Sequence, residues 1–236
     1  MSNAMILAAG RGVRLLPLTA AVPKPLIEVA GQTLIEHHLQ RLAALGVTRV
    51  VINLHHLGAA IRRRLGHGEG FDLEIVFSDE PELLETAGGI IKALPLLGKE
   101  PFLLVNGDIY CDFDPAALAP LAEGIHAHLL MVPRPSWQER GDFDLGVPVP
   151  GSLGDVCRLR GDGKGTLTYA GMARYHPQLF AGLAAGFRPM RPVLEAAIAA
   201  GRVSAQVHDG LWEDIGTLER LAMLRRRLKT AEAGTP

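Results

Sequence analysis

Residues 4–26, with the sequence AMILAAGRGVRLLPLTAAVPKPL, decide the fold. The stretch begins with a short apolar run, residues 5–9, which is typical of a buried parallel strand. A turn with two glycines, Gly10 and Gly12, follows at once. Open α/β sheets bind phosphates where a strand runs into such a turn, because glycines let the backbone come close and its N–H groups point at the anion. The stretch therefore predicts a phosphate-binding loop.

Cationic side chains accompany this loop. Arg11 and Arg14 lie in or beside the turn, and Lys24 stands between two prolines that restrict its backbone. A polyphosphate needs such positive charge. Two known phosphate motifs do not fit. The Rossmann fingerprint requires a third glycine where Val13 and Leu15 stand, and the Gly-Lys-Ser/Thr of a P-loop is missing.

The full pattern of the stretch resembles the signature of the sugar-phosphate nucleotidyltransferases, L-A-A-G-x-G-x-R-x-x-P-L-T followed by P-K-P-L. Both parts are present here, the first over residues 7–19 and the second over residues 23–26. The resemblance covers nearly the whole chain. It implies an enzyme in which the phosphate of a sugar 1-phosphate attacks the α-phosphorus of a nucleoside triphosphate and pyrophosphate leaves.

The resemblance also implies which residues contact the nucleotide. One group is the phosphate loop with its cations, of which Arg14 and Lys24 are implied to be catalytic. The other is the segment from Glu85 to Gly89, where two glycines opening a helix let a flat base approach free N–H groups. The nucleotide-binding residues expected on this basis are Leu7, Ala8, Ala9, Gly10, Arg11, Gly12, Val13, Arg14, Lys24, Glu85, Thr86, Gly88 and Gly89.

Two aspartates are candidates for a metal site. Asp108 follows the apolar strand expected at residues 101–105, which places it at the same edge of the sheet as the glycine loop. From Asn106-Gly107-Asp108 alone, an ordinary turn is the better interpretation. Asp214, however, lies in a stretch that resembles the family's W-x-D-I-G-T motif. A carboxylate beside a triphosphate needs a cation between them, and Mg²⁺ takes one or two carboxylates with phosphate oxygens. The resemblance implies that Asp108, which would also be catalytic, and Asp214 hold Mg²⁺.

Segments in the second half of the chain resemble family segments that contact the sugar. The resemblance implies sugar-phosphate contacts for Asp142, Gly171 and Glu195 there, and for Asn106 in the first half of the chain. Many family members also carry a Glu-Lys-Pro segment whose lysine meets the sugar phosphate. This sequence has none, although Lys164 stands nearby between glycines. The identity of the cation that holds the sugar phosphate therefore stays open.

The alternation of expected strands and helices up to residue 132 predicts an α/β fold, a three-layer, Rossmann-like and mostly parallel sheet. From Pro133 onward, short extended pieces predict a small sugar-binding lobe, rich in loops and strands, over the sheet edge. We expect one domain, residues 1–236, with a nucleotide-binding part at 1–132 and a sugar-binding part with a closing helix at 133–236.

Individual strands and helices are also expected from residue 115 onward. Hairpins joined by Gly161-Asp162-Gly163 form the lobe, with strands at 145–149, 157–160 and 166–173. A further strand is expected at 203–207. Helices are expected at 115–123, 177–183, 191–200 and 217–228.

Composition narrows the possible partners. The 236 residues carry a formal net charge of −1, so nothing indicates a nucleic-acid surface or a polybasic membrane contact. No apolar run approaches the length of a membrane span, and no signal peptide is evident. Cys111 and Cys157 give neither metal-ligand spacing nor a disulfide framework. We expect a cytoplasmic enzyme that binds a nucleoside triphosphate and a sugar 1-phosphate, and the oligomeric state stays open.

Within the family, the chain most resembles the N-acetylmuramate-1-phosphate uridylyltransferases of cell-wall recycling. This resemblance rests on residues 5–10, 84–86, 94–98 and 101–108. It implies UTP and N-acetylmuramate 1-phosphate as substrates. Mannose-1-phosphate guanylyltransferases and glucose-1-phosphate thymidylyltransferases share most of these motifs, so both stay open as alternatives. A regulatory module that binds a nucleotide sugar without catalysis is a third alternative, and transfer to phosphocholine, which favours an aromatic cage, is a fourth.

Overall fold

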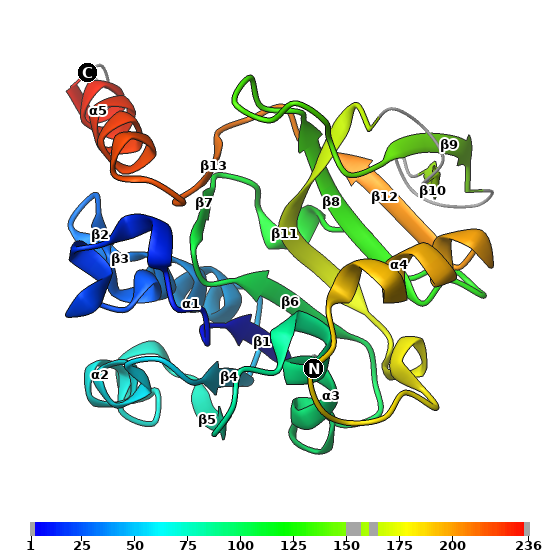
Figure 1. The fold of residues 1–236 in the computed structure, drawn as a ribbon, viewed down its shortest axis with the longest axis horizontal. Helices are drawn as coiled ribbons and strands as arrows, with labels where there is room; N and C mark the ends of the chain where they lie inside the picture. The colour runs from blue at the N-terminus through cyan, green and yellow to red at the C-terminus, as the bar shows by residue number, and fades with distance from the viewer. Residues whose placement is uncertain (1–2, 150–156, 161–164, 234–236) are drawn as a thin grey trace.

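A large mixed sheet forms the centre of the computed structural model, which describes residues 3–149, 157–160 and 165–233 (Figure 1). The sheet has nine strands in the order β5-β4-β1-β6-β11-β8-β12-β10-β9. Their bounds are β1 Ala4–Leu7, β4 Arg49–Leu54, β5 Glu74–Asp79, β6 Phe102–Asn106, β8 Ala127–Pro133, β9 Asp144–Pro148, β10 Cys157–Arg160, β11 Leu167–Tyr175 and β12 Val203–Val207. Two short antiparallel pairs stand beside it, formed by β2 Glu28–Val29 with β3 Gln32–Thr33 and by β7 Ile109–Cys111 with β13 Trp212–Asp214.

Strands β5, β4, β1 and β6 run parallel to one another. In β1 and β6 the residues are apolar on both faces, because helices cover the sheet from both sides. Ile6 and Val105 contact the hydrophobic cluster on one face, and Met5 and Leu104 contact the cluster on the other. The predicted buried strand therefore lies in the middle of the parallel part of the sheet.

Helices lie on both faces of the sheet. Side chains of α1 (Leu34–Ala44) and α2 (Gly58–Leu65) join one cluster, and those of α3 (Glu85–Leu97) and α4 (Met190–Ala199) join the other. The last helix, α5 (Leu218–Ala233), packs instead against the 3₁₀ turn that follows the phosphate loop. The predicted α/β class with three layers is confirmed. None of the helices in the described ranges is both long and apolar enough to cross a membrane.

Two of the predicted helices, at 115–123 and 177–183, are wrong. Residues 115–123 form only a 3₁₀ turn, Pro115–Ala117, because Pro120 lacks an N–H and forces the preceding residue away from helical dihedrals. The N–H of Ala119 donates instead to Oε1 of Gln206, at 2.8 Å. Residues 177–183 likewise form only the 3₁₀ turn Pro177–Phe180.

One strand expected in the small lobe lies in the middle of the main sheet. Strands β9 and β10 pair antiparallel as expected, but β11 enters the main sheet between β6 and β8 and runs antiparallel to both. The sheet therefore runs through both parts of the chain. The β11–β8 register shifts between Tyr169 and Ala173, around Gly171, whose φ is +79°. The turn Gly161-Asp162-Gly163 and Lys164 lie outside the described residues.

Candidate active site

The phosphate loop joins β1 to the 3₁₀ turn Val13–Leu15. Its shape requires glycine at position 12, where φ is +64° and a Cβ atom would lie 2.9 Å from Cγ2 of Thr19. The hydroxyl of Thr19 donates to the carbonyl of Gly12 at 2.8 Å and fixes the turn. Over the described ranges, the N–H groups of Gly10 and Arg11 meet no protein acceptor. The loop therefore presents free donors, as an anion site needs.

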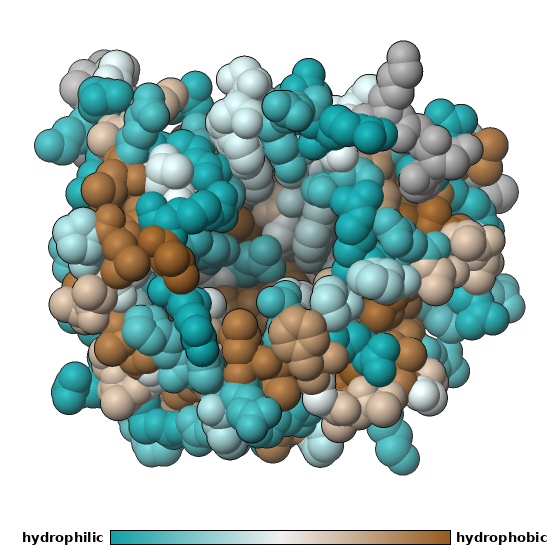
Figure 2. Space-filling model, in the orientation of Figure 1, coloured by the Kyte–Doolittle hydropathy of each residue, from teal (hydrophilic) through white to brown (hydrophobic). Residues whose placement is uncertain are grey.

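A cavity of about 430 Å³ opens beside this loop. Figure 2 shows the face hollowed near its centre, with hydrophilic side chains on the rim. The cavity brings together most of the predicted nucleotide residues and two others predicted further along the chain. These lining residues are Leu7, Ala8, Ala9, Gly10, Arg11, Gly12, Val13, Lys24, Glu85, Thr86, Asn106 and Asp108. Asn53, Glu80, Leu83 and Pro25 line it as well.

Lys24 and Asp108 meet at this cavity although 84 residues separate them. Nζ of Lys24 donates to Oδ2 of Asp108 at 2.8 Å. The lysine side chain is only 9% exposed, whereas the aspartate side chain is 34% exposed. The short 3₁₀ turn Lys24–Leu26 begins after Pro23, which is extended, so the lysine is held at the cavity by its backbone as well as by the ion pair.

The second aspartate is brought to the first by strand pairing. Asp214 in β13 lies opposite Ile109 in β7, and the N–H of Ile215 donates to the carbonyl of Asp108 at 3.0 Å. Oδ2 of Asp214 also lies 3.1 Å from Nη1 of Arg220 and 3.9 Å from Nη2 of Arg14. Two carboxylates on adjacent strand ends, beside a loop that presents free N–H groups, offer the hard oxygen ligands that Mg²⁺ prefers. The residues present therefore fit this ion.

Three predicted residues are placed differently from the expectation. Arg14 lies against Asp214 and does not line the cavity. Helix α3 begins at Glu85, so Gly88 and Gly89 lie inside it and are buried. The expected approach of a base to free amides there is wrong for Gly88, whose N–H donates to the carbonyl of Arg188 at 3.1 Å. A Cβ at position 88 would lie 2.2 Å from the carbonyl oxygen of Gly186, so this glycine serves close packing.

The residues predicted for the sugar form two groups. Asn106 and Gly171 are neighbours, since a Cβ at position 171 would lie 2.7 Å from Nδ2 of Asn106. Asp142 and Glu195 lie apart from the cavity lining and share Arg191, at 3.6 Å and 2.8 Å from their carboxylate oxygens. Arg191 is missed by the sequence analysis. The four-residue spacing from Arg191 to Glu195 on a helix is the signal that could have found it.

Two further features of the site are not predicted from the sequence. Asn53 and Glu80 form a buried pair beneath the phosphate loop. Arg220 places its guanidinium 4.1 Å from the ring centre of Trp137 while it holds Asp214, so the closing helix and the loop before β9 meet at the second aspartate. No local sequence pattern signals either feature, because the first joins the ends of two strands and the second joins a helix, a strand end and a loop.

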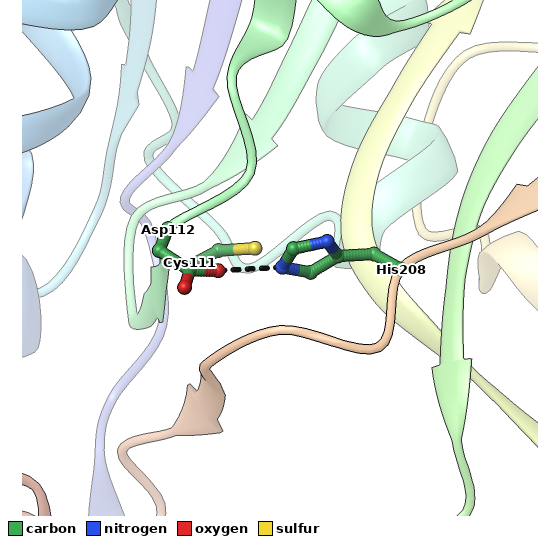
Figure 3. Close-up of side chains that lie close together, drawn as sticks. All are labelled: Cys111, Asp112 and His208. Atoms are coloured by element: carbon green, nitrogen blue, oxygen red, sulfur yellow. Dashed lines mark hydrogen bonds and ion pairs between the residues drawn. The ribbon is translucent and has the colours of Figure 1, made fainter.

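A separate cluster lies at the end of β7. Cys111, Asp112 and His208 have their side-chain atoms close together, with Nε2 of His208 2.6 Å from Oδ1 of Asp112 (Figure 3). The thiol of Cys111 belongs to the hydrophobic core, and burial raises its pKa to about 11. It therefore stays a packing group at neutral pH, and the Asp112–His208 contact ties the segment after β12 to β7.

Comparisons with known proteins show the family of this chain. Residues 3–144 match the family described as nucleotidyl transferase. The chain is 47% identical to N-acetylmuramate α-1-phosphate uridylyltransferase from Neisseria meningitidis serogroup B, with 93% of this chain and 95% of that protein covered. It is 34% identical to the protein of the same name from Caulobacter vibrioides, with 98% and 97% covered.

A solved structure agrees in fold. The putative glucose-1-phosphate thymidylyltransferase from Bacillus anthracis aligns with a TM-score of 0.79 and 18% identity over 96% of this chain and 95% of that one. At that identity the likeness concerns the fold alone. The family match and the two relatives that span almost the whole length show that this chain belongs to the nucleotidyl transferase family.

Proposed function

We propose that this protein transfers a uridylyl group from UTP to N-acetylmuramate 1-phosphate and releases pyrophosphate. The observation that carries the proposal is the Lys24–Asp108 ion pair at the cavity, beside a loop with free N–H groups. Asp214 lies next to this pair because β13 pairs with β7. That arrangement suits the joining of two anions. The choice of substrates is supported by the names of the two relatives that match almost the whole chain.

The chemistry requires charge neutralisation and alignment more than covalent catalysis. The N–H groups of the phosphate loop and Arg11 bind the β- and γ-phosphates at the cavity. Arg14, which lies outside the cavity lining, adds positive charge beside Asp214. Lys24 bridges the reacting phosphates. An oxygen of the sugar phosphate attacks the α-phosphorus in line while the bond to the β-phosphate oxygen breaks, so no covalent enzyme intermediate forms. Asp108 and Asp214 would hold Mg²⁺, which would supply further neutralisation of the phosphate charge.

The two sides of the cavity then have different tasks. Glu85 and Thr86 line the cavity and bind the nucleoside. Asn106, next to Gly171, lies at the end of β6 and binds the sugar side of the reacting phosphates. Asp142 and Glu195 bind sugar hydroxyls, with Arg191 between them. Because N-acetylmuramate is a cell-wall sugar, we place the reaction in cell-wall recycling in the cytoplasm.

The experiment is a crossed panel of pyrophosphate release with Mg²⁺. UTP, GTP, dTTP and CTP are each combined with N-acetylmuramate 1-phosphate, mannose 1-phosphate, glucose 1-phosphate and phosphocholine. The proposal predicts fast release with UTP and N-acetylmuramate 1-phosphate. Fast release with another pair would show that the proposed substrates are wrong and that the protein still catalyses nucleotidyl transfer. Nucleotide binding without release from any pair would favour the non-catalytic module.

A further inference from the structure

A buried polar pair underlies the phosphate loop. Asn53 is at the end of β4 and Glu80 directly follows β5, and each is 3% exposed. Oδ1 of Asn53 accepts from the N–H of Ala8 at 2.8 Å, and Nδ2 of Asn53 donates to Oε1 of Glu80 at 2.8 Å. Oε2 of Glu80 accepts from the N–H of Leu84 at 3.4 Å. The chain of contacts thus runs from the phosphate loop to the segment that begins α3.

The surroundings leave these two side chains little freedom. A Cβ on Gly89 of α3 would lie 2.6 Å from Oε1 of Glu80 and 3.0 Å from Nδ2 of Asn53, so the helix touches both side chains with its backbone. Burial raises the pKa of Glu80. A buried amide or carboxyl without its partner is costly, so each side chain requires the other in this orientation.

The pair connects the two walls of the cavity. Ala8 begins the phosphate loop, whereas Leu84 immediately precedes Glu85 and Thr86, and Asn53 and Glu80 themselves line the cavity. The distance between the wall that binds phosphates and the opposite wall therefore depends on three hydrogen bonds. A preformed spacing of this kind lowers the cost of binding, because the loop does not have to be ordered by the ligand.

We propose that Asn53 and Glu80 are positioning residues that hold the phosphate loop and the 84–86 segment at the spacing a nucleoside triphosphate needs. The inference rests on the proposed function, in that a nucleoside triphosphate is the ligand of this cavity. Asn53 and Glu80 act through the backbone of Ala8 and Leu84. Their contribution therefore concerns affinity for the nucleotide, and chemistry at the α-phosphorus proceeds through Lys24 and the two aspartates.

The directions of the hydrogen bonds give a sharp test. Position 53 must offer an acceptor to Ala8 and a donor to position 80. In Asn53→Asp, a carboxylate oxygen faces the Glu80 carboxyl, and in Glu80→Gln, an amide N–H₂ can face the amide of Asn53. The double variant Asn53→Asp/Glu80→Gln restores every contact with the donor and acceptor exchanged, because the new amide donates to the new carboxylate and still accepts from Leu84.

Each variant is compared with the unmodified protein by titration calorimetry with UTP, GTP, dTTP and CTP, by KM and kcat for pyrophosphate release, and by thermal unfolding. Glu36→Gln is the matched control, since Glu36 is also buried and hydrogen-bonded but belongs to the capping box of α1. We expect each single change to weaken binding of the preferred triphosphate and to raise its KM, both about tenfold, with a smaller change in kcat. In the double variant Asn53→Asp/Glu80→Gln, the affinity for the preferred triphosphate and its KM return to within about threefold of those of the unmodified protein. Glu36→Gln lowers thermal stability and leaves the affinity for the triphosphate and its KM unchanged.

Additive losses in the double variant, or single variants that bind the triphosphate normally, would overturn the inference. A fall in thermal stability without a change in affinity would also overturn it, because that is the signature of a purely structural pair. Failure of the proposed function is distinguishable, since it appears as absent pyrophosphate release in the unmodified protein while the binding comparison still decides the role of the pair.

Discussion

The phosphate side and the sugar side of this site are built differently. On the phosphate side, the backbone supplies the donors and the Lys24 side chain is 9% exposed. On the sugar side, Arg191 is 57% exposed and lies between two carboxylates on different elements. Buried pairs and backbone donors keep one geometry, whereas exposed ion pairs rearrange at little cost. Under the proposed function, phosphate binding is fixed by the fold and sugar choice depends on adjustable side chains.

The largest expected effect comes from the centre of the phosphate side. Asp108→Asn removes a proposed ligand of Mg²⁺ and the partner of Lys24. We expect kcat for pyrophosphate release to fall about 10³-fold. Thermal unfolding should change little, because the side chain is 34% exposed. Asp209→Asn, at an exposed position, is the control and should behave as the unmodified protein. Turnover within a few-fold of normal in Asp108→Asn would remove Asp108 from the catalytic set.

Lys24→Ala tests the other half of the ion pair. It removes the cation that we propose bridges the reacting phosphates, and we expect kcat to fall about 10²-fold with a smaller change in KM for the sugar phosphate. Lys99→Ala, at an exposed position, is the control. Steady-state kinetics with both substrates varied separate the two parameters. A loss confined to KM for the triphosphate would mean that Lys24 binds nucleotide without acting on the chemistry.

A pair of glycine substitutions tests whether the loop shape matters beyond stability. Gly12→Ala places a Cβ 2.9 Å from Thr19 at φ +64°, whereas Gly124→Ala meets nothing within 4 Å at φ +75°. Both changes should cost about 1 kcal/mol or more of folding stability, because alanine disfavours this backbone region. Only Gly12→Ala should also raise KM for the triphosphate, by about tenfold. Equal kinetics in the two variants would refute a shaping role for Gly12.

On the sugar side, Arg191→Ala leaves Asp142 and Glu195 without their shared cation. We expect KM for the sugar 1-phosphate to rise about fivefold and KM for the triphosphate to stay unchanged, since exposed ion pairs contribute little each. The comparison variant is Arg202→Ala, at an exposed position outside this group. If Arg191→Ala altered KM for the triphosphate instead, the division of the site into two sides would be wrong.

The smallest effect concerns pH and lies on the phosphate side. Burial, followed by the charge of Arg41, lowers the pKa of His38 from 6.5 to about 4. Between these values the unfolded chain binds more protons than the folded chain, so stability falls as pH falls from 6.5 to 4. We expect a loss of about 5 °C in the unfolding midpoint over this range.

His38→Gln provides the check on this prediction. Its amide can still donate to the carbonyl of Ile109, which lies 3.0 Å from Nε2 of His38, but it does not titrate. The pH dependence of the unfolding midpoint should become shallower in this variant. An unchanged slope would mean that other groups govern the acid sensitivity.

The phosphate side could be predicted from the sequence because its information is local. A strand, two glycines and a lysine between prolines lie within 23 residues, and each has a direct backbone consequence. The approach of Asp214 to Asp108 could be expected only through the family resemblance, because it depends on the pairing of β7 with β13.

The rest could not be predicted because it depends on register between distant segments. The place of β11 between β6 and β8, and the contacts of Asn53 with Glu80 and of Arg220 with Trp137, leave no periodic pattern. The expected helix at 115–123 fails for a local reason, since Pro120 interrupts it. Gly88 was misassigned because glycine serves both ligand approach and close packing, and the sequence does not distinguish them.

The most direct test of the account follows the product itself. Unmodified protein and the Asp108→Asn and Asp214→Asn variants are incubated with UTP, N-acetylmuramate 1-phosphate and Mg²⁺, and the uridine diphosphate sugar and pyrophosphate are quantified by mass spectrometry. The account predicts equal amounts of the two products from the unmodified protein and almost none from either variant. No product from the unmodified protein, or normal amounts from both variants, would contradict it.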